Sequence, residues 1–220
     1  MTALPMNSTE IASRQARYEA EVARHWDAQP LDGAHDLGHL HRVWANARLI
    51  AMDEPCDLEI LPAVFFHDLI NLPKPHPGRT SASRLSADAA CAFLAADGFA
   101  TDKLAAVAHA ITAHSFSANI PPQTAEARVL QDADRLEALG AIGLARMFHV
   151  AGALGGRLFD AADPMALRRP LDDRRFALDH METKLLRLPE RMQTAAGRAM
   201  AESRADWMMS FRTRLLAELG

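Results

Sequence analysis

The sequence predicts an all-α fold, a bundle of helices. In several segments apolar residues recur every three to four positions, which is the period of an α-helix with one buried face. No segment alternates apolar and polar residues with the period of two that marks a half-buried strand. The chain has 220 residues, 49% of them apolar, which is enough to bury the core of one domain spanning residues 1–220.

The first two predicted helices each have one apolar face. Residues 9–26 and 39–51 place apolar side chains at spacings close to four and seven, the pattern of a helix that buries one side. We assign the first of these helices to packing alone. Asp36 precedes the second helix, and an aspartate in that position caps the free N–H groups of a helix start.

Two more helices are expected after this pair. Residues 57–70 form the first, begun by Asp57 and kinked at Pro62, because proline lacks the N–H that a helix interior requires. Residues 83–96 form the second, and the pair Asp97-Gly98 is a typical C-terminal signal.

Threonines mark the starts of the following helices. Thr101 can cap a helix that runs to His114, and Thr124 can cap another that runs to about Ala141. Residues 152–175 are rich in Gly, Pro, Asp and Arg, which indicates a long connection that could act as a lid.

The C-terminal helices, within residues 176–219, are expected to pack on a core of about residues 20–150. Apolar spacing predicts one helix over residues 178–188, ended by Pro189, and a last helix over residues 207–215.

Charge and composition exclude several classes of protein. The formal net charge is −4 and no basic cluster offsets it, so we expect no nucleic-acid partner. The first residues lack the features of a secretion signal, and no apolar run approaches the roughly 20 residues that span a bilayer. We therefore expect a cytoplasmic monomer or homodimer with a small-molecule partner and no membrane partner. Cys56 and Cys91 lack CxxC spacing, which predicts buried thiols rather than a disulfide or a thiolate zinc site.

The run LPAVFFHDLI carries a histidine and an aspartate into the core. Residues 61–66 are apolar on every helical face, so His67 and Asp68 are expected to share their burial. A buried carboxylate is costly unless an arginine, a protonated histidine or a metal ion compensates its charge.

Two other helices bring polar side chains to apolar faces. His39 borders the buried stripe of residues 39–51, and Asp134 lies four residues after Leu130 on the face of a later helix. Two imidazoles and two carboxylates from three helices form a mixed nitrogen and oxygen ligand set, which suits Mn, Fe, Zn, Co or Ni and tolerates Mg. One divalent metal ion would compensate the burial of all four residues.

Each of these residues also has a purely structural interpretation. The His-Asp pair occurs twice in the chain, so the dipeptide alone is weak evidence. His39 alone would more often be a hydrogen-bonded core histidine, and Asp134 could pair with Arg135 or Arg42. Only the complete set of four favours a metal site.

The set H39…H67-D68…D134 resembles the signature of the HD-domain metal-dependent phosphohydrolases, a histidine, a His-Asp pair and a distant aspartate on successive helices. The runs HDLGHLHRVW, FFHDLINLPK, ITAHSF and QDADRLEALGAIGLAR are similar to segments of that family, and the resemblance spans about residues 20–215. It is strongest to the small bacterial members that include nucleoside triphosphate pyrophosphohydrolases. The resemblance implies an HD-domain helical bundle and a metal-dependent phosphohydrolase whose expected substrate is a nucleotide, for instance a triphosphate split into monophosphate and pyrophosphate.

Position by position, the resemblance assigns the metal ligands to His39, His67, Asp68 and Asp134. Asp132 is the alternative to Asp134, because helical phase does not exclude it. We prefer Asp134 and assign Asp132 to the residues that support the ligands. Asp68 could also orient the attacking water.

Two further histidines and a loop complete the candidate site. His35 can bind substrate, cap the following helix or support a ligand, and His114 is either a core side chain or a catalytic group that contacts a phosphate or the attacking water. Lys74 and Arg79 follow the His-Asp pair on a proline-rich loop. There they could bind phosphate oxygens during substrate binding and catalysis, or they could be solvated loop residues.

Two other functions are compatible with the same predicted metal ligands. The family resemblance also reaches di-iron oxygenases, in which His35 or His114 could serve a second metal. A degenerate site would instead leave a non-catalytic nucleotide sensor. The basic loop favours phosphate chemistry over the first alternative, and the complete ligand set disfavours the second.

Overall fold

The structure of the protein is a computed structural model that describes four ranges of the chain, 8–27, 36–57, 61–72 and 76–219. They fall into two compact units, the first ending at Gln131 and the second beginning at Asp132. The described residues contain helices and no β-strand, only an isolated bridge between Arg157 and Phe176, which confirms the all-α prediction. None of the described helices is long and apolar enough to cross a bilayer.

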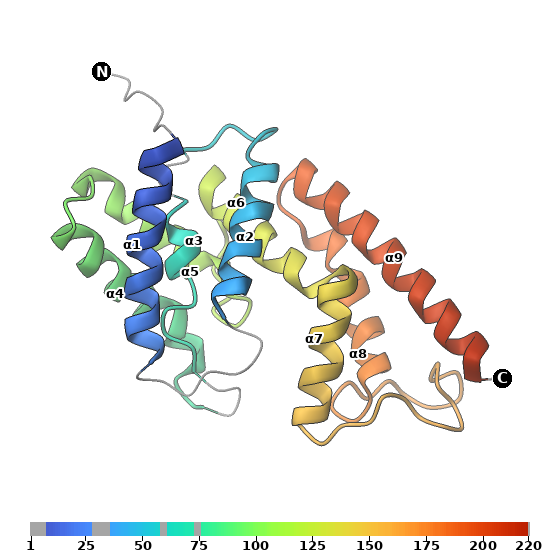
Figure 1. Ribbon diagram of the computed structural model, residues 1–220. Coiled ribbons are helices and arrows are strands. Elements are labelled where there is room, and N and C mark those ends of the chain that lie inside the picture. The colour runs from blue at the N-terminus through green and yellow to red at the C-terminus, as the bar shows by residue number, and fades with distance from the viewer. Residues whose placement is uncertain (1–7, 28–35, 58–60, 73–75, 220) are drawn as a thin grey trace. The chain divides into compact units, whose positions relative to one another are not determined.

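The described helices follow one another along the chain as labelled in Figure 1. Those that begin in the first unit are α1 (Ser8–Trp26), α2 (Leu37–Ile50), α3 (Ala63–Phe66), η1 (Arg79–Ser81), α4 (Ala82–Ala96), η2 (Thr101–Lys103), α5 (Leu104–His114) and α6 (Ala125–Arg135). Those of the second unit are η3 (Leu136–Ala138), α7 (Gly140–Ala153), α8 (Ala177–Thr183), η4 (Leu185–Arg187), η5 (Pro189–Arg191) and α9 (Ala195–Leu219). The elements labelled η are short 3-10 helices.

The short helix α3 lies at the centre of the first unit. It packs against α1, α2, α4 and α5 (Figure 1). Its four residues are at most 2% exposed, as expected for a segment that is apolar on every helical face. Residues at the end of α3 are therefore delivered into the core of this unit.

The prediction of one helix over residues 57–70 is wrong. Part of that range, residues 58–60, lies outside the described residues, and α3 covers only Ala63–Phe66. Pro62 precedes α3 as its N-cap instead of kinking a longer helix. A proline is tolerated at a helix start because the first N–H groups have no partner within the helix.

The helix that Thr124 begins is also shorter than predicted. Thr124 Oγ1 accepts a hydrogen bond from the backbone N–H of Ala127 at 3.2 Å, which confirms the cap. The helix does not reach Ala141, because α6 and η3 end before Gly140, whose φ of 69° is in the left-handed region that favours glycine. A separate helix, α7, starts there, and we did not predict it.

The last two helices differ from their predicted lengths in opposite directions. α8 ends at Thr183 rather than near residue 188, and Pro189 begins η5 instead of ending a helix. α9 starts twelve residues before the predicted residue 207, at Ala195. Its first half is rich in alanine, whose high helix propensity extends the helix although no apolar stripe marks it.

Residues 152–175 form an ordered connection that is fixed to α8. The Arg169 guanidinium makes two hydrogen bonds to the buried Asp179 carboxylate, at 2.5 and 2.9 Å, and lies 4.4 Å from the centre of the Phe176 ring. The backbone N–H of Asp172 donates to the same carboxylate at 2.7 Å. These contacts stabilise one conformation of the connection next to α8.

The two cysteines are half-buried free thiols, less buried than we predicted. Burial raises the pKa of Cys56 and of Cys91, with nearby carboxylates acting in the same direction. Both side chains therefore stay in the thiol form at neutral pH.

Replacing Gly143 with alanine should destabilise the protein. A Cβ added at Gly143 in α7 would lie 2.3 Å from the backbone C and O atoms of Ala138, which cannot move aside as a flexible side chain would. We expect a loss of about 1–3 kcal/mol in the free energy of unfolding, measured by urea denaturation. Gly152→Ala in the same helix is the control, because its Cβ would meet no atom within 4 Å, and it should be neutral or stabilising. Equal effects of the two substitutions would contradict the steric explanation.

Candidate metal centre

His67 and Asp68 follow α3 directly and leave the helix in a tight turn. They form a turn, and Leu69 and Ile70 form a bend. We call residues 67–70 the His-Asp turn. The His67 side chain is fully buried, whereas that of Asp68 is 21% exposed. The expected burial therefore holds for the imidazole, while part of the carboxylate remains accessible.

Two imidazole rings in the first unit are oriented by backbone carbonyl groups. His67 Nδ1 donates to the carbonyl oxygen of Val64 at 2.7 Å, and His114 Nδ1 donates to that of Ile111 at 2.5 Å. Each acceptor lies in the last turn of a helix, where carbonyl groups lack helical partners. A carbonyl oxygen can only accept, so the proton is on Nδ1 and Nε2 of the neutral ring carries a lone pair. This is the usual orientation of a metal-binding histidine.

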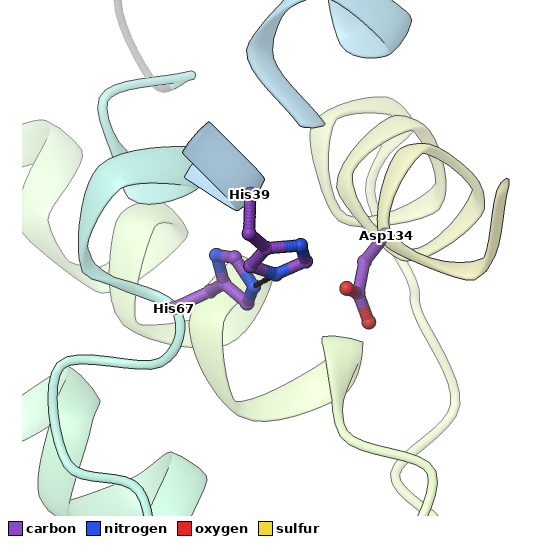
Figure 2. Close-up of side chains that lie close together, drawn as sticks. All are labelled: His39, His67 and Asp134. Atoms are coloured by element: carbon purple, nitrogen blue, oxygen red, sulfur yellow. Dashed lines mark hydrogen bonds between the residues drawn. The ribbon is translucent and has the colours of Figure 1, made fainter. Parts of the chain in front are cut away.

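His39 meets His67 from the first turn of α2. The Asp36 side chain accepts a hydrogen bond from the backbone N–H of His39 at 2.7 Å, which confirms the predicted cap. The His39 side chain is 1% exposed, and its Nε2 lies 3.3 Å from His67 Nε2. Figure 2 shows the two imidazole rings, with this contact as a dashed line.

The Asp68 carboxylate approaches the same two nitrogen atoms. Asp68 Oδ2 lies 3.5 Å from His67 Nε2 and 3.9 Å from His39 Nε2. Two nitrogen ligands at about 2.0–2.1 Å from one metal ion lie about 2.9 Å apart at a right angle and about 3.4 Å apart at the tetrahedral angle. The separation of 3.3 Å between the two Nε2 atoms is therefore suitable for two ligands of one ion.

His114 belongs to the same cluster. Its Nε2 lies 3.5 Å from Asp68 Oδ1, and its ring centre is 4.7 Å from that of His67. His67, Asp68 and His114 are also a group of side chains that could hold a metal ion. From the sequence, His114 was either a core or a catalytic residue. The structure places it beside the carboxylate, with its side chain 7% exposed.

A pocket connects Asp68 and His114 with the solvent. Several side chains in it can donate hydrogen bonds, and the hydroxyl oxygens of Ser115 and Ser117 lie 3.1 Å apart. Arg79 is half-buried there and donates to the carbonyl oxygen of Leu72. The lining consists of Asp68, Ile70, Asn71, Arg79, Ala82, Ser83, His114, Ser115 and Ser117. We did not predict Asn71 or the two serines, because single polar residues in loops form no sequence pattern.

Asp132, the alternative last ligand, is hydrogen-bonded to the segment before α9. Its fully buried carboxylate accepts from the backbone N–H groups of Gln193 and Thr194 at 2.9 and 2.8 Å, and from Thr194 Oγ1 at 2.8 Å. Burial raises the pKa of the Asp132 carboxyl, and these hydrogen bonds oppose the shift. A Cβ at Gly197 would lie 2.5 Å from Asp132 Oδ2, so this close approach requires glycine.

The remaining predicted site residues are placed as follows. Asp134 is half-buried in the last turn of α6, in the part of this helix that belongs to the second unit. Figure 2 draws its side chain as the third residue. His35 and Lys74 lie outside the described residues. His76, two residues after Lys74 in the sequence, is exposed, and its ring accepts a hydrogen bond from the backbone N–H of Gly78.

Several known proteins are similar to this chain in sequence and in fold. The HD domain family matches residues 36–139. The uncharacterized protein YpgQ of Bacillus subtilis is 35% identical over 201 residues, which cover 88% of this chain and 90% of YpgQ. The crystal structure of YpgQ in complex with ADP has a TM-score of 0.70 at 32% identity and covers 91% of this chain and 97% of that chain. An HD-superfamily hydrolase from Bacillus thuringiensis has a TM-score of 0.68 at 28% identity, with 93% and 97% covered.

The family match includes the residues that define the cluster. The matched range contains His39, the His-Asp turn, His114 and Asp134. The resemblance found in the sequence motifs is confirmed by the family match and by the HD-superfamily hydrolase structure. The chain belongs to the HD-domain family.

Proposed function

We propose that the protein is a metal-dependent phosphohydrolase that acts on a nucleotide. The main support is the arrangement around Asp68, whose carboxylate lies within 3.5–3.9 Å of three imidazole Nε2 atoms and also lines a pocket that contains Arg79. The relative YpgQ has been crystallised with ADP, which supports the proposal that this protein also binds a phosphorylated ligand.

The proposed ligands of the divalent ion are His39, His67, Asp68 and Asp134. His39 and His67, drawn in Figure 2, each offer one ring nitrogen to an ion, and Asp134 is proposed as the last ligand on the family resemblance. The hydrogen bond from His67 Nδ1 to Val64 leaves Nε2 available as a ligand. This donor set suits Mn, Mg, Fe, Co, Ni or Zn. When bound, the ion would supply a water of lowered pKa and would polarise a phosphoryl oxygen.

The other polar groups would act on water and substrate. Asp68 can orient the attacking water, and the lone pair on His114 Nε2, 3.5 Å from Asp68 Oδ1, can accept one of its protons. Arg79, with Lys74 on the preceding loop, would hold phosphate oxygens while negative charge develops on them. His35 is a further proposed substrate contact.

The reaction can be tested by phosphorus NMR in ¹⁸O-labelled water. Metal-loaded protein is mixed with nucleoside mono-, di- and triphosphates, and both the products and the position of the label are read. Monophosphate plus pyrophosphate, with the label in the monophosphate, indicates that water attacked the α-phosphorus of a triphosphate. Orthophosphate indicates attack at a terminal phosphorus. No turnover of any nucleotide would contradict the proposed function.

Three further measurements, of nucleotide affinity, iron content and oxygen consumption, separate the two alternative functions. Tight nucleotide binding without any product would favour a sensor. Two tightly bound iron ions with oxygen consumption would favour an oxygenase. The lining of the pocket favours a phosphohydrolase over an oxygenase, because Arg79, Ser115 and Ser117 offer hydrogen-bond donors suited to phosphate oxygens.

Arg79→Ala should raise the KM for the nucleotide. Arg79 lines the pocket and is half-buried, so its contact with a bound phosphate would be partly screened by solvent. We expect KM to rise about 10-fold, from the loss of a hydrogen bond between charged groups. Steady-state kinetics at saturating metal measures the change.

Two further variants control this experiment. Arg79→Lys keeps the positive charge and should recover part of the affinity. Arg84→Ala removes an exposed arginine of α4 that does not line the pocket, and its KM should equal that of the wild type. If Arg79→Ala and Arg84→Ala have the same kinetics, Arg79 does not bind the phosphate.

A further inference from the structure

The last residue of α1 is bonded to the backbone of the His-Asp turn. Trp26 Nε1 donates a hydrogen bond to the carbonyl oxygen of Asp68 at 3.3 Å, although 42 residues separate the two in the chain. The Trp26 side chain is 4% exposed, so its indole is enclosed by the core of the first unit. We had assigned α1 to packing alone, and this contact gives the helix a direct connection to a proposed metal ligand.

A side chain of α4 fixes the other end of the same turn. Ser86 Oγ accepts from the backbone N–H of Ile70 at 3.0 Å and lies 3.4 Å from the carbonyl oxygen of Ile70, to which it donates. A hydroxyl group can donate one hydrogen bond and accept others, so it can serve both backbone groups. Ser86 is fully buried, and these contacts are therefore protected from water.

The backbone of the His-Asp turn requires such support because it lies outside the helices. α3 ends before His67, and residues 67–72 have no helix assignment. His67 is oriented through its own ring by the bond to Val64. The Asp68 carboxylate, in contrast, depends on the position of the turn for its distances to the imidazole nitrogens.

We propose that Trp26 and Ser86 are positioning residues that hold the His-Asp turn in the conformation in which Asp68 binds metal. The proposal rests on the metal-binding role of Asp68 in the proposed function. Groups that orient ligands through hydrogen bonds typically change metal affinity by about 10–100-fold when they are removed. Trp26 acts on the carbonyl of the ligand residue itself, and Ser86 acts two residues further along the backbone.

The test compares Mn²⁺ binding to metal-stripped full-length proteins by titration calorimetry. Trp26→Phe keeps an aromatic ring and removes the N–H donor, and Ser86→Ala removes the hydroxyl group. Each should bind Mn²⁺ at least about 10-fold more weakly than the wild type. Trp44→Phe is the matched control, because Trp44 packs against Phe65 in α3, outside the His-Asp turn, with ring centres 5.9 Å apart. Its Mn²⁺ affinity should stay within about twofold of the wild type.

Amide hydrogen exchange gives a second readout that needs no metal. In the metal-free Trp26→Phe and Ser86→Ala proteins, the amides of residues 67–71 should exchange faster than in the wild type, while those of α5 should be unchanged. Wild-type exchange and wild-type Mn²⁺ affinity in both variants would overturn the proposal. It would also be overturned if Trp44→Phe weakened Mn²⁺ binding as strongly, or if the wild type bound no Mn²⁺. A wild type that binds Mn²⁺ but hydrolyses no nucleotide would overturn only the proposed function.

Discussion

Asp68→Asn is expected to lower phosphohydrolase activity by about 10³-fold or more and to remove most of the bound metal. The Asp68 carboxylate lies 3.5, 3.5 and 3.9 Å from the Nε2 atoms of His67, His114 and His39. Asparagine has nearly the same shape but no negative charge, so it cannot compensate a divalent ion or orient a metal-bound water equally well. Metal content by mass spectrometry and kcat by phosphorus NMR measure the two effects.

The matched control for this experiment is Asp88→Asn. Asp88 is an exposed residue of α4, and its replacement should leave both metal content and kcat at wild-type values. The metal-free Asp68→Asn protein should also unfold at nearly the same urea concentration as metal-free wild type, because the side chain is partly exposed. Wild-type metal content in Asp68→Asn would remove Asp68 from the ligand set.

Capping side chains in the sequence predicted where α2 and α6 start. Asp36 and Thr124 each accept a hydrogen bond from a backbone N–H three residues later, and both caps were predicted. The helix bounds predicted around α3 were wrong, because this segment is apolar on every face and has no period that defines its ends. Gly140 was a missed signal, because glycine in the left-handed region commonly ends a helix.

Some features of the candidate site could be predicted from the sequence, and others required the structure. The apolar faces of the helices predicted that His39 and His67 would be buried, and the structure adds that their Nε2 atoms meet at 3.3 Å. The orientation of His67 and His114 depends on carbonyl groups at helix ends, which could not be located before those ends were known. The bond from Trp26 to Asp68 joins residues 42 positions apart and has no counterpart in any local pattern.

Asp134→Asn and Asp132→Ala should have opposite effects on metal binding and stability. Asp132 accepts hydrogen bonds from Gln193 and Thr194 while fully buried, so its removal leaves several donors without an acceptor. We expect Asp132→Ala to lower the free energy of unfolding by about 3 kcal/mol, measured by urea denaturation. Its folded fraction should bind Mn²⁺ with wild-type affinity, because the carboxylate contributes to the fold rather than to the ion.

Asp134→Asn should instead weaken Mn²⁺ binding by about 100-fold and change the stability of the metal-free protein by less than about 0.5 kcal/mol. The half-buried Asp134 lies two residues after Asp132 on α6, where side chains differ in direction by about 200°. One carboxylate can therefore fix the start of α9 while the other serves a different partner. If Asp132→Ala lost Mn²⁺ binding and Asp134→Asn retained it, the last ligand would be Asp132, and the HD-domain signature of this chain would have to be realigned by two residues.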